Sequence, residues 1–250
     1  MNISELSVST DDAIQNVGMQ YYFAPTTAAK AETLGLNAFE FYGLGRGGVL
    51  GGADTSEVVE AFTFFSSGAI EFLYGAPRAK ADPVATAKAH IDAAYDYADN
   101  TFGGISTDLL SSFARVAEKV VQGVKPGQYA LFDGYMQFPF PASPVHAAYL
   151  ATVLLRELRG GAHIDAIKEV GLSAVDATYL ENSAIYKMHG FTDDEAPSVT
   201  PDLEALKKKA DAVSDAKFAE YLSVLDDAEQ AVFLEGVNAM FAATTSPQAV

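Results

Sequence analysis

Six side chains have the chemistry to hold a charged or aromatic ligand. Arg156 and Arg159 are three residues apart in the run LLRELRGGAH. On a helix they would therefore be neighbours and could clamp a carboxylate or phosphate through paired N–H donors. An arginine isolated among glycines could join this clamp. One histidine lies before the run and another ends it, and a tyrosine pair lies near the N-terminus. The full set of candidate ligand-binding residues is Tyr22, Arg46, His146, Arg156, Arg159 and His163.

Each candidate also has a purely structural interpretation. In an acidic chain the two helical arginines can pair with carboxylates such as Glu157 and Glu169, and Tyr22 can belong to the core. Two histidines with a carboxylate could hold zinc or iron. No HxxxH or HxxE pair occurs at close spacing, however. The sequence therefore predicts structural or capping histidines and no metal site, and it indicates no particular cofactor.

A glycine-rich stretch, GLGRGGVLGG at residues 43–52, formally matches a dinucleotide-binding fingerprint through Gly43, Gly45 and Gly48. Such a site requires a strand before the glycines, a helix opening on the third one and further βα units after it. The chain downstream has helical periodicity almost throughout. We therefore expect a glycine-rich loop here, without a bound nucleotide.

Residues 144–180 organise the rest of the chain. A long helix is expected from Pro144, with Gly160 and Gly161 ending it, and two shorter helices then cross at Gly171. Glycine supplies the left-handed residue in a helix-turn-helix of this kind. A DNA-reading second helix would carry Lys, Arg, Asn or Gln. The residues present instead are Ser173, Asp176, Thr178 and Glu181.

Several motifs together resemble an actinobacterial helix-turn-helix-like family that is related to winged-helix proteins and has no assigned biochemical role. They are YYFAP, GLGRGGVLG, LLRELRGGAH, IDAIKEVGL and GFTDDE, which together span most of residues 18–195. The family usually has histidine where this chain has Leu158. It also tends to end in a winged-helix hairpin, where this chain has VTPDLEALKKKADAV. The resemblance thus implies the fold, while these departures disfavour a metal or haem site and DNA binding.

Composition excludes several classes of function. The chain has 33 acidic and 16 basic residues and a net charge of −17, which repels nucleic acid and anionic lipid. It has no cysteine, so thiolate chemistry and disulfides are ruled out. Its polar N-terminus, MNISELSVSTDD, is unlike a signal peptide, and no apolar run is long enough to span a bilayer. We therefore expect a cytoplasmic protein with neither membrane nor nucleic acid as partner.

The predicted fold is all-α, of helix-turn-helix or winged-helix ancestry. We expect an N-terminal helical half at 1–124, an ordered aromatic and proline-rich crossover at 125–144, and a helix-turn-helix-like half at 145–250 with a loose tail; the whole could form one compact unit. TLGLNAFEFYGL at 33–44 aligns with EVGLSAVDATYL at 169–180. This alignment suggests two related halves with a crevice between them, although alanine-rich helices can also resemble one another by chance.

The leading hypothesis is a small-molecule-binding protein. An apolar pocket between the halves would take an anionic, partly aromatic ligand, with the arginines and histidines as polar anchors. One alternative is an enzyme that uses the same pocket with a histidine as acid, base or metal ligand. Another is a transcriptional regulator. A homodimer is one assembly we consider.

Overall fold

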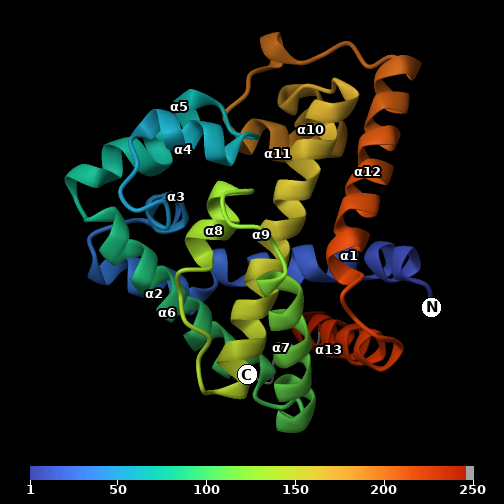
Figure 1. Cartoon of the computed structure of the whole chain (residues 1–250). Helices are drawn as coiled ribbons and strands as arrows, with labels where there is room; N and C mark the ends of the chain where they lie inside the picture. Colours follow the sequence, from blue (N-terminus) through green and yellow to red (C-terminus); the bar gives the residue numbers. More distant parts are fainter. Residues whose placement is uncertain (246–250) are drawn as a thin grey trace.

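One long helix forms the centre of the fold. The computed structural model describes residues 1–245, and in it α9 (Pro144–Val170) runs through the middle of the molecule with other helices on all sides (Figure 1). Pro144 occupies its first turn, where the missing N–H is not needed, and Gly171 ends it with φ 78°. Residues 147–155 of α9 are buried without interruption, as expected of a helix surrounded by others.

The remaining elements are helices and short turns of helix, and the described residues contain no β-strand. Before α9 come α1 (Ile3–Met19), the 3₁₀ turn η1 (Gln20–Phe23), α2 (Pro25–Thr33), α3 (Ala38–Gly48), α4 (Thr55–Phe62), α5 (Ser67–Ile70), the π-helical turn η2 (Glu71–Gly75), the 3₁₀ turn η3 (Ala76–Ala79), α6 (Pro83–Phe102), α7 (Thr107–Gln122) and α8 (Ala130–Tyr135). After it come α10 (Ala174–Glu181), α11 (Ser183–Met188), the 3₁₀ turn η4 (Asp193–Glu195), α12 (Pro201–Leu222) and α13 (Asp227–Thr245). The all-α prediction is confirmed. No helix of the described chain combines the length and apolar character needed to cross a membrane.

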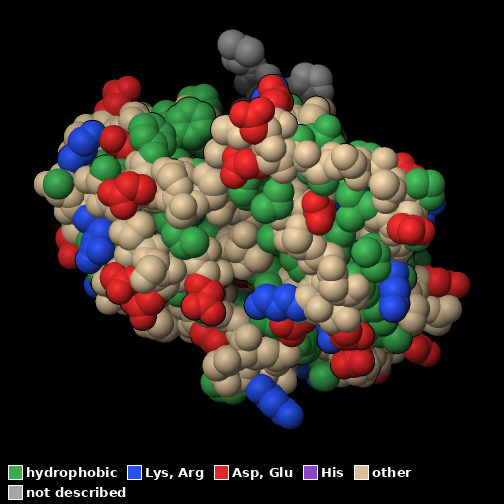
Figure 2. Space-filling model, turned by 90° about the horizontal axis from the view of Figure 1, so that it is seen from above, with side chains coloured by type: hydrophobic (Ala, Val, Ile, Leu, Met, Phe, Trp, Pro, Cys, Tyr) green, Lys and Arg blue, Asp and Glu red, His purple; other side chains and the backbone are tan. Residues whose placement is uncertain are grey.

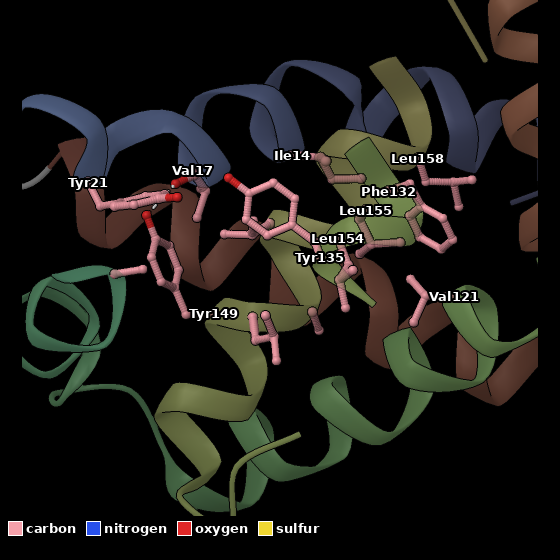
Figure 3. Packing of buried hydrophobic residues seen from close by; sticks show 14 of the residues in the cluster. Ile14, Val17, Tyr21, Val121, Phe132, Tyr135, Tyr149, Leu154, Leu155 and Leu158 are labelled. Atoms are coloured by element: carbon pink, nitrogen blue, oxygen red, sulfur yellow. Dashed lines mark hydrogen bonds between the residues drawn. The ribbon is translucent and has the colours of Figure 1, made fainter. Parts of the chain in front are cut away.

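Helices from both ends of the chain pack on α9. Its neighbours include α1, α6, α7, α8 and α12, and α13 packs on α1 and α7. Figure 3 shows part of the resulting core, where Ile14 from α1, Val121 from α7 and Phe132 from α8 gather around the leucines of α9. Because this one buried cluster draws on residues from Leu6 to Met240, the two predicted halves share a core. The division into halves stays a prediction, and residues 246–250 of the predicted loose tail lie outside the described part.

Two predicted breaks are wrong. Gly160 and Gly161 do not end a helix, since α9 continues through both to Val170. A Cβ at Gly161 would collide with the ring of Tyr129, so this glycine permits close packing. The stretch 43–52 is likewise no loop up to Gly48, because α3 begins after the capping residue Asn37 and ends only there. In both places a glycine lets its helix pack closely against a neighbouring element, and the helix itself continues without a break.

The predicted crossover, 125–144, contains the short helix α8, and Tyr135 from it is fully buried. The two aligned motifs have the same local form. Gly35 and Gly171 both take left-handed backbone angles, at φ 70° and 78°, and each is followed two residues later by a helix-capping side chain. This likeness is limited to the glycine turn and the helix cap that follows it. A symmetric pair of halves stays a prediction.

Candidate functional site

Arg46 reaches the centre of the molecule because its helix is rich in glycine. In α3 a Cβ at Gly43 would meet Leu73 of η2, one at Gly45 would meet His90 of α6, and one at Gly48 would meet the carbonyl of Pro83. Side chains at these positions would hold the neighbouring elements apart. Their absence lets α3 pack closely against both, so that Arg46, only 10% exposed, points toward α9.

Arg46 pairs there with Glu157, a carboxylate on the buried side of α9. Its Nε donates to Oε1 at 3.2 Å and its Nη2 to Oε2 at 2.9 Å, which makes a bidentate pair. Arg156 Nη1 donates to the same Oε1 at 2.7 Å and to the hydroxyl of Tyr22 at 3.1 Å. Arg46 Nη1 donates to the hydroxyl of Tyr42 at 3.3 Å. We call these five residues the arginine cluster.

The arginine cluster contains two guanidinium groups and one carboxylate. Burial alone would raise the pKa of Glu157, but Arg46 and Arg156 outweigh it and hold that pKa below its usual value. Burial likewise opposes the charge on Arg46, and the Glu157 carboxylate more than compensates, raising the pKa of that guanidinium. All three groups are therefore charged at neutral pH, and the largely buried arginine cluster has a net charge of +1.

A tyrosine and a histidine adjoin the arginine cluster. Tyr21 Oη lies 3.2 Å from Nδ1 of His90, and the His90 ring stacks on that of Tyr22 with centroids 5.7 Å apart. Burial, with a smaller contribution from Arg46, lowers the pKa of His90 to about 3. His90 is therefore neutral and adds no charge. Burial raises the pKa of Tyr21 well above its usual value, so its hydroxyl stays protonated.

Two buried polar atoms in and beside the arginine cluster have no hydrogen-bond partner within the described chain. They are Nε of Arg156 and Nε2 of His90. Most buried polar groups in proteins are hydrogen-bonded, because a group left without a partner costs the loss of its hydration. At the arginine cluster these unsatisfied atoms coincide with a net positive charge.

Aromatic rings form the side of the arginine cluster that faces α4. The Arg46 guanidinium carbon lies 4.6 Å from the centroid of the Phe62 ring, and Tyr42 packs against Phe62, Phe65 and Phe23. Phe23 is 47% exposed. The rings thus extend from the buried charges to the surface.

The structure brings three of the six predicted ligand residues together, namely Tyr22, Arg46 and Arg156. Arg159 lies apart from them and pairs with Asp11 of α1 and Asp215 of α12. Both helical arginines are thus paired with carboxylates, which is the structural interpretation considered above. The role of the six residues in binding a ligand stays a prediction.

The two predicted histidines also lie apart from the arginine cluster and from each other. His146 Nε2 lies 2.9 Å from a carboxylate oxygen of Asp99, and its ring stacks on Tyr95. His163 stacks on Phe64, with ring centroids 5.8 Å apart. Burial and then Lys207 lower the pKa of His163. The described residues contain no group of three or more His, Cys, Asp or Glu side chains that could hold a metal.

Sequence reasoning missed Glu157 as a central residue, and also His90 and Tyr135. A signal for two of them existed. Glu157 interrupts the apolar run of α9. His90 lies three residues after Ala87 and four before Ala94, a spacing that places it on the same apolar face of a helix. A charged or polar residue on a buried face is the informative exception in such a pattern. Tyr135 gave no comparable signal.

Two shallow hollows lie elsewhere on the surface. One, between α2 and α6, is lined by Thr26, Ala29, Lys30, Thr33, Asp96, Asp99 and Asn100. The other is lined by residues of α7, α8 and their connection, including Val121, Phe132 and Met136. Neither contains a residue of the arginine cluster. The apolar pocket expected between the halves stays a prediction.

The helix-turn-helix element is formed by the end of α9, Gly171 and α10. Ser173 caps α10, accepting from the backbone N–H of Asp176 at 3.0 Å. α10 carries no Lys, Arg, Asn or Gln between Ala174 and Glu181. On the face shown in Figure 2 basic side chains occur as separate groups among more numerous acidic ones. This distribution is unlike the continuous basic surface typical of nucleic-acid-binding proteins.

A family model described as "Helix-turn-helix family" matches residues 8–205. This range includes α3, α6, α9 and α10, and hence both the arginine cluster and the helix-turn-helix element. No curated protein matches the chain, and no solved structure does.

Proposed function

The chain belongs to this helix-turn-helix family, and we propose that it binds a small, anionic and partly aromatic molecule at the arginine cluster. The observation that carries the proposal is the charge balance of the buried site: Arg46 and Arg156 share a single carboxylate, Glu157. A ligand carboxylate or phosphate would supply the missing negative charge. It would also accept from Arg156 Nε, which has no acceptor among the described residues.

The energetic argument rests on desolvation. Removing a charge from water is costly unless it is paired and hydrogen-bonded. The arginines of the cluster are already desolvated when the protein folds. An anion that binds there is therefore attracted by a positive charge that is only weakly screened, because the surroundings have a low dielectric constant. Arg159, by contrast, pairs with two carboxylates, those of Asp11 and Asp215.

The neighbouring rings support an aromatic component in the ligand. Tyr22, Tyr42 and Phe62 surround the guanidinium groups, with the Arg156 guanidinium carbon 5.3 Å from the Tyr22 ring centroid. Rings at this position can stack on a flat ligand while the arginines bind its charged group. His90 Nε2 remains available to a polar substituent.

Calorimetry with a charged and a neutral probe of the same shape tests the proposal. We expect benzoate to bind and to raise the melting temperature, and benzamide to do so far less, because only benzoate supplies the missing charge. Arg156→Ala should abolish benzoate binding. Arg115→Ala is the matched control, since Arg115 is exposed and pairs with Glu229 on α13.

Because Arg156→Ala also removes a buried ion pair, a milder variant is needed. Tyr22→Phe deletes only the hydroxyl that Arg156 contacts and should weaken benzoate binding while the fold is kept. Equal binding of benzoate and benzamide, or benzoate binding that survives both Arg156→Ala and Tyr22→Phe, would contradict the proposal. Native mass spectrometry of protein purified without added ligand would then show whether another molecule occupies the site.

Transcriptional regulation is the second candidate, and the family match favours it. The left-handed turn at Gly171 has the form expected of a helix-turn-helix. The acidic α10 and the net charge of −17 oppose binding to phosphate. Salt-dependent binding to duplex DNA would support this function. The enzyme alternative, the homodimer and the cytoplasmic location stay predictions.

A further inference from the structure

A strained segment begins at the last residue of α4 and lies against the arginine cluster. Residues Phe62–Ser66, which we call the strap, connect α4 to α5. Within the strap Thr63 has φ 51° and ψ −50°, and it is the only described residue other than glycine with a positive φ. A β-branched residue avoids this backbone conformation, so surrounding contacts must hold it in place.

The inner end of the strap rests on the arginine cluster. The Phe62 ring packs under the Arg46 guanidinium group, 4.6 Å from its carbon, and Phe62 is only 3% exposed. Phe65 packs against both Phe62 and Tyr42. Displacing the strap would therefore uncover the aromatic side of the arginine cluster.

The outer part of the strap is held by the helix-turn-helix element together with α12 and His189, which we call the helix-turn-helix end of the molecule. Phe64 packs on a small separate cluster formed by Ile167, Leu172, Ala177 and Ala210, which come from α9, the turn, α10 and α12. Its carbonyl accepts from His189 Nδ1 at 3.0 Å, and the N–H of Ser66 donates to the carbonyl of His189 at 2.9 Å. The His189 ring stacks on Phe65 with centroids 3.9 Å apart.

We propose that the strap is a lid over the arginine cluster, and that Phe64 and His189 are the latch that fastens it to the helix-turn-helix end. The inference rests on the proposed function, for which it supplies the route by which a ligand enters. The strain at Thr63 favours opening, and the contacts of Phe64 and Phe65 oppose it. Because Phe62 and Phe64 belong to one short strap, uncovering Arg46 also withdraws Phe64 from α9, α10 and α12.

Chemical labelling of arginine tests the lid without any ligand. Phenylglyoxal reacts with accessible guanidinium groups, and mass spectrometry of peptides gives the labelling rate of Arg46. We expect Phe64→Ala and His189→Ala each to raise that rate roughly tenfold, as loss of one half-buried aromatic contact shifts an opening equilibrium. Phe72→Ala is the control, because Phe72 is 57% exposed and lies outside the strap; it should leave the rate unchanged.

Hydrogen exchange on the same proteins tests the coupling to the helix-turn-helix end. Faster exchange in α10 of Phe64→Ala, alongside faster labelling of Arg46, is the expected result. Arg46 labelling at the wild-type rate in both latch variants, with their helical circular dichroism intact, would overturn the lid. Benzoate binding reports separately on the proposed function. If benzoate binds but neither latch substitution changes the labelling of Arg46, the lid proposal is refuted and the binding proposal stands. If labelling is faster but benzoate does not bind, the lid proposal is supported and benzoate is refuted as a ligand.

Discussion

Replacing Glu157 by glutamine should reveal the uncompensated charge of the arginine cluster. Glutamine keeps the shape of the side chain but leaves Arg46 and Arg156 buried with no carboxylate. The Glu157 and Arg46 side chains are only 3% and 10% exposed, so solvent screening is slight. Loss of one partner of a buried pair costs about 3–5 kcal/mol. For a chain of this size that corresponds to a melting temperature lower by roughly 6–20 °C.

The pH dependence of this loss has a definite sign. The folded-state pKa of Glu157 is lowered, so its contribution is complete above the unfolded value of about 4.3 and disappears as pH falls through the folded value. The difference in unfolding free energy between wild type and Glu157→Gln should therefore be constant from pH 6 to 8. Below about pH 4 it should shrink toward zero, because protonated Glu157 resembles glutamine.

Urea unfolding followed by far-ultraviolet circular dichroism at several pH values measures both effects. Glu169→Gln is the matched control, because Glu169 pairs with Lys217 at the surface. An exposed pair of this kind contributes about 0–1 kcal/mol. If Glu157→Gln cost no more than Glu169→Gln, or if the difference did not change in acid, the buried arginines would not depend on this carboxylate. The charge argument for an anionic ligand would then fail with it.

Four further substitutions test the packing of the fold. Between pH 7 and 5 the free energy of unfolding of the wild type should fall by about 2 kcal/mol more than that of His90→Phe. His90 has a folded pKa of about 3 and therefore takes up a proton only on unfolding. Urea titration of both proteins measures the difference. Gly48→Ala should unfold at lower temperature because its Cβ would meet Pro83 O, whereas Gly160→Ala, in open space within α9, should be more stable by about 0.5–1 kcal/mol. Gly171→Ala should cost about 1 kcal/mol in thermal unfolding, since alanine rarely takes φ 78°.

The sequence predicted an all-helical chain, a long helix from Pro144 and a left-handed turn at Gly171, and the structure contains all three. The prediction failed at α3 and in the middle of α9, where glycine was interpreted as a break. Local propensity disfavours glycine in a helix by up to about 1 kcal/mol. The glycines let α3 pack closely on η2 and α6, and this packing depends on neighbours that are distant in sequence.

The same limit applies to the arginine cluster. Arg156 and Arg159 are three residues apart and were expected to act together, yet α9 directs them to different partners: Arg156 to Glu157 and Tyr22, and Arg159 to α1 and α12. Helical spacing fixes which residues are neighbours on a surface, but a helix buried on all sides has a different neighbour at each position. Glu157 meets Arg46 across 111 residues of sequence, a pairing set by the glycines of α3. The glycine stretch of α3 and the arginine run of α9 therefore act together in this fold. The glycines let α3 approach closely, and this approach brings Arg46 to Arg156 and Glu157.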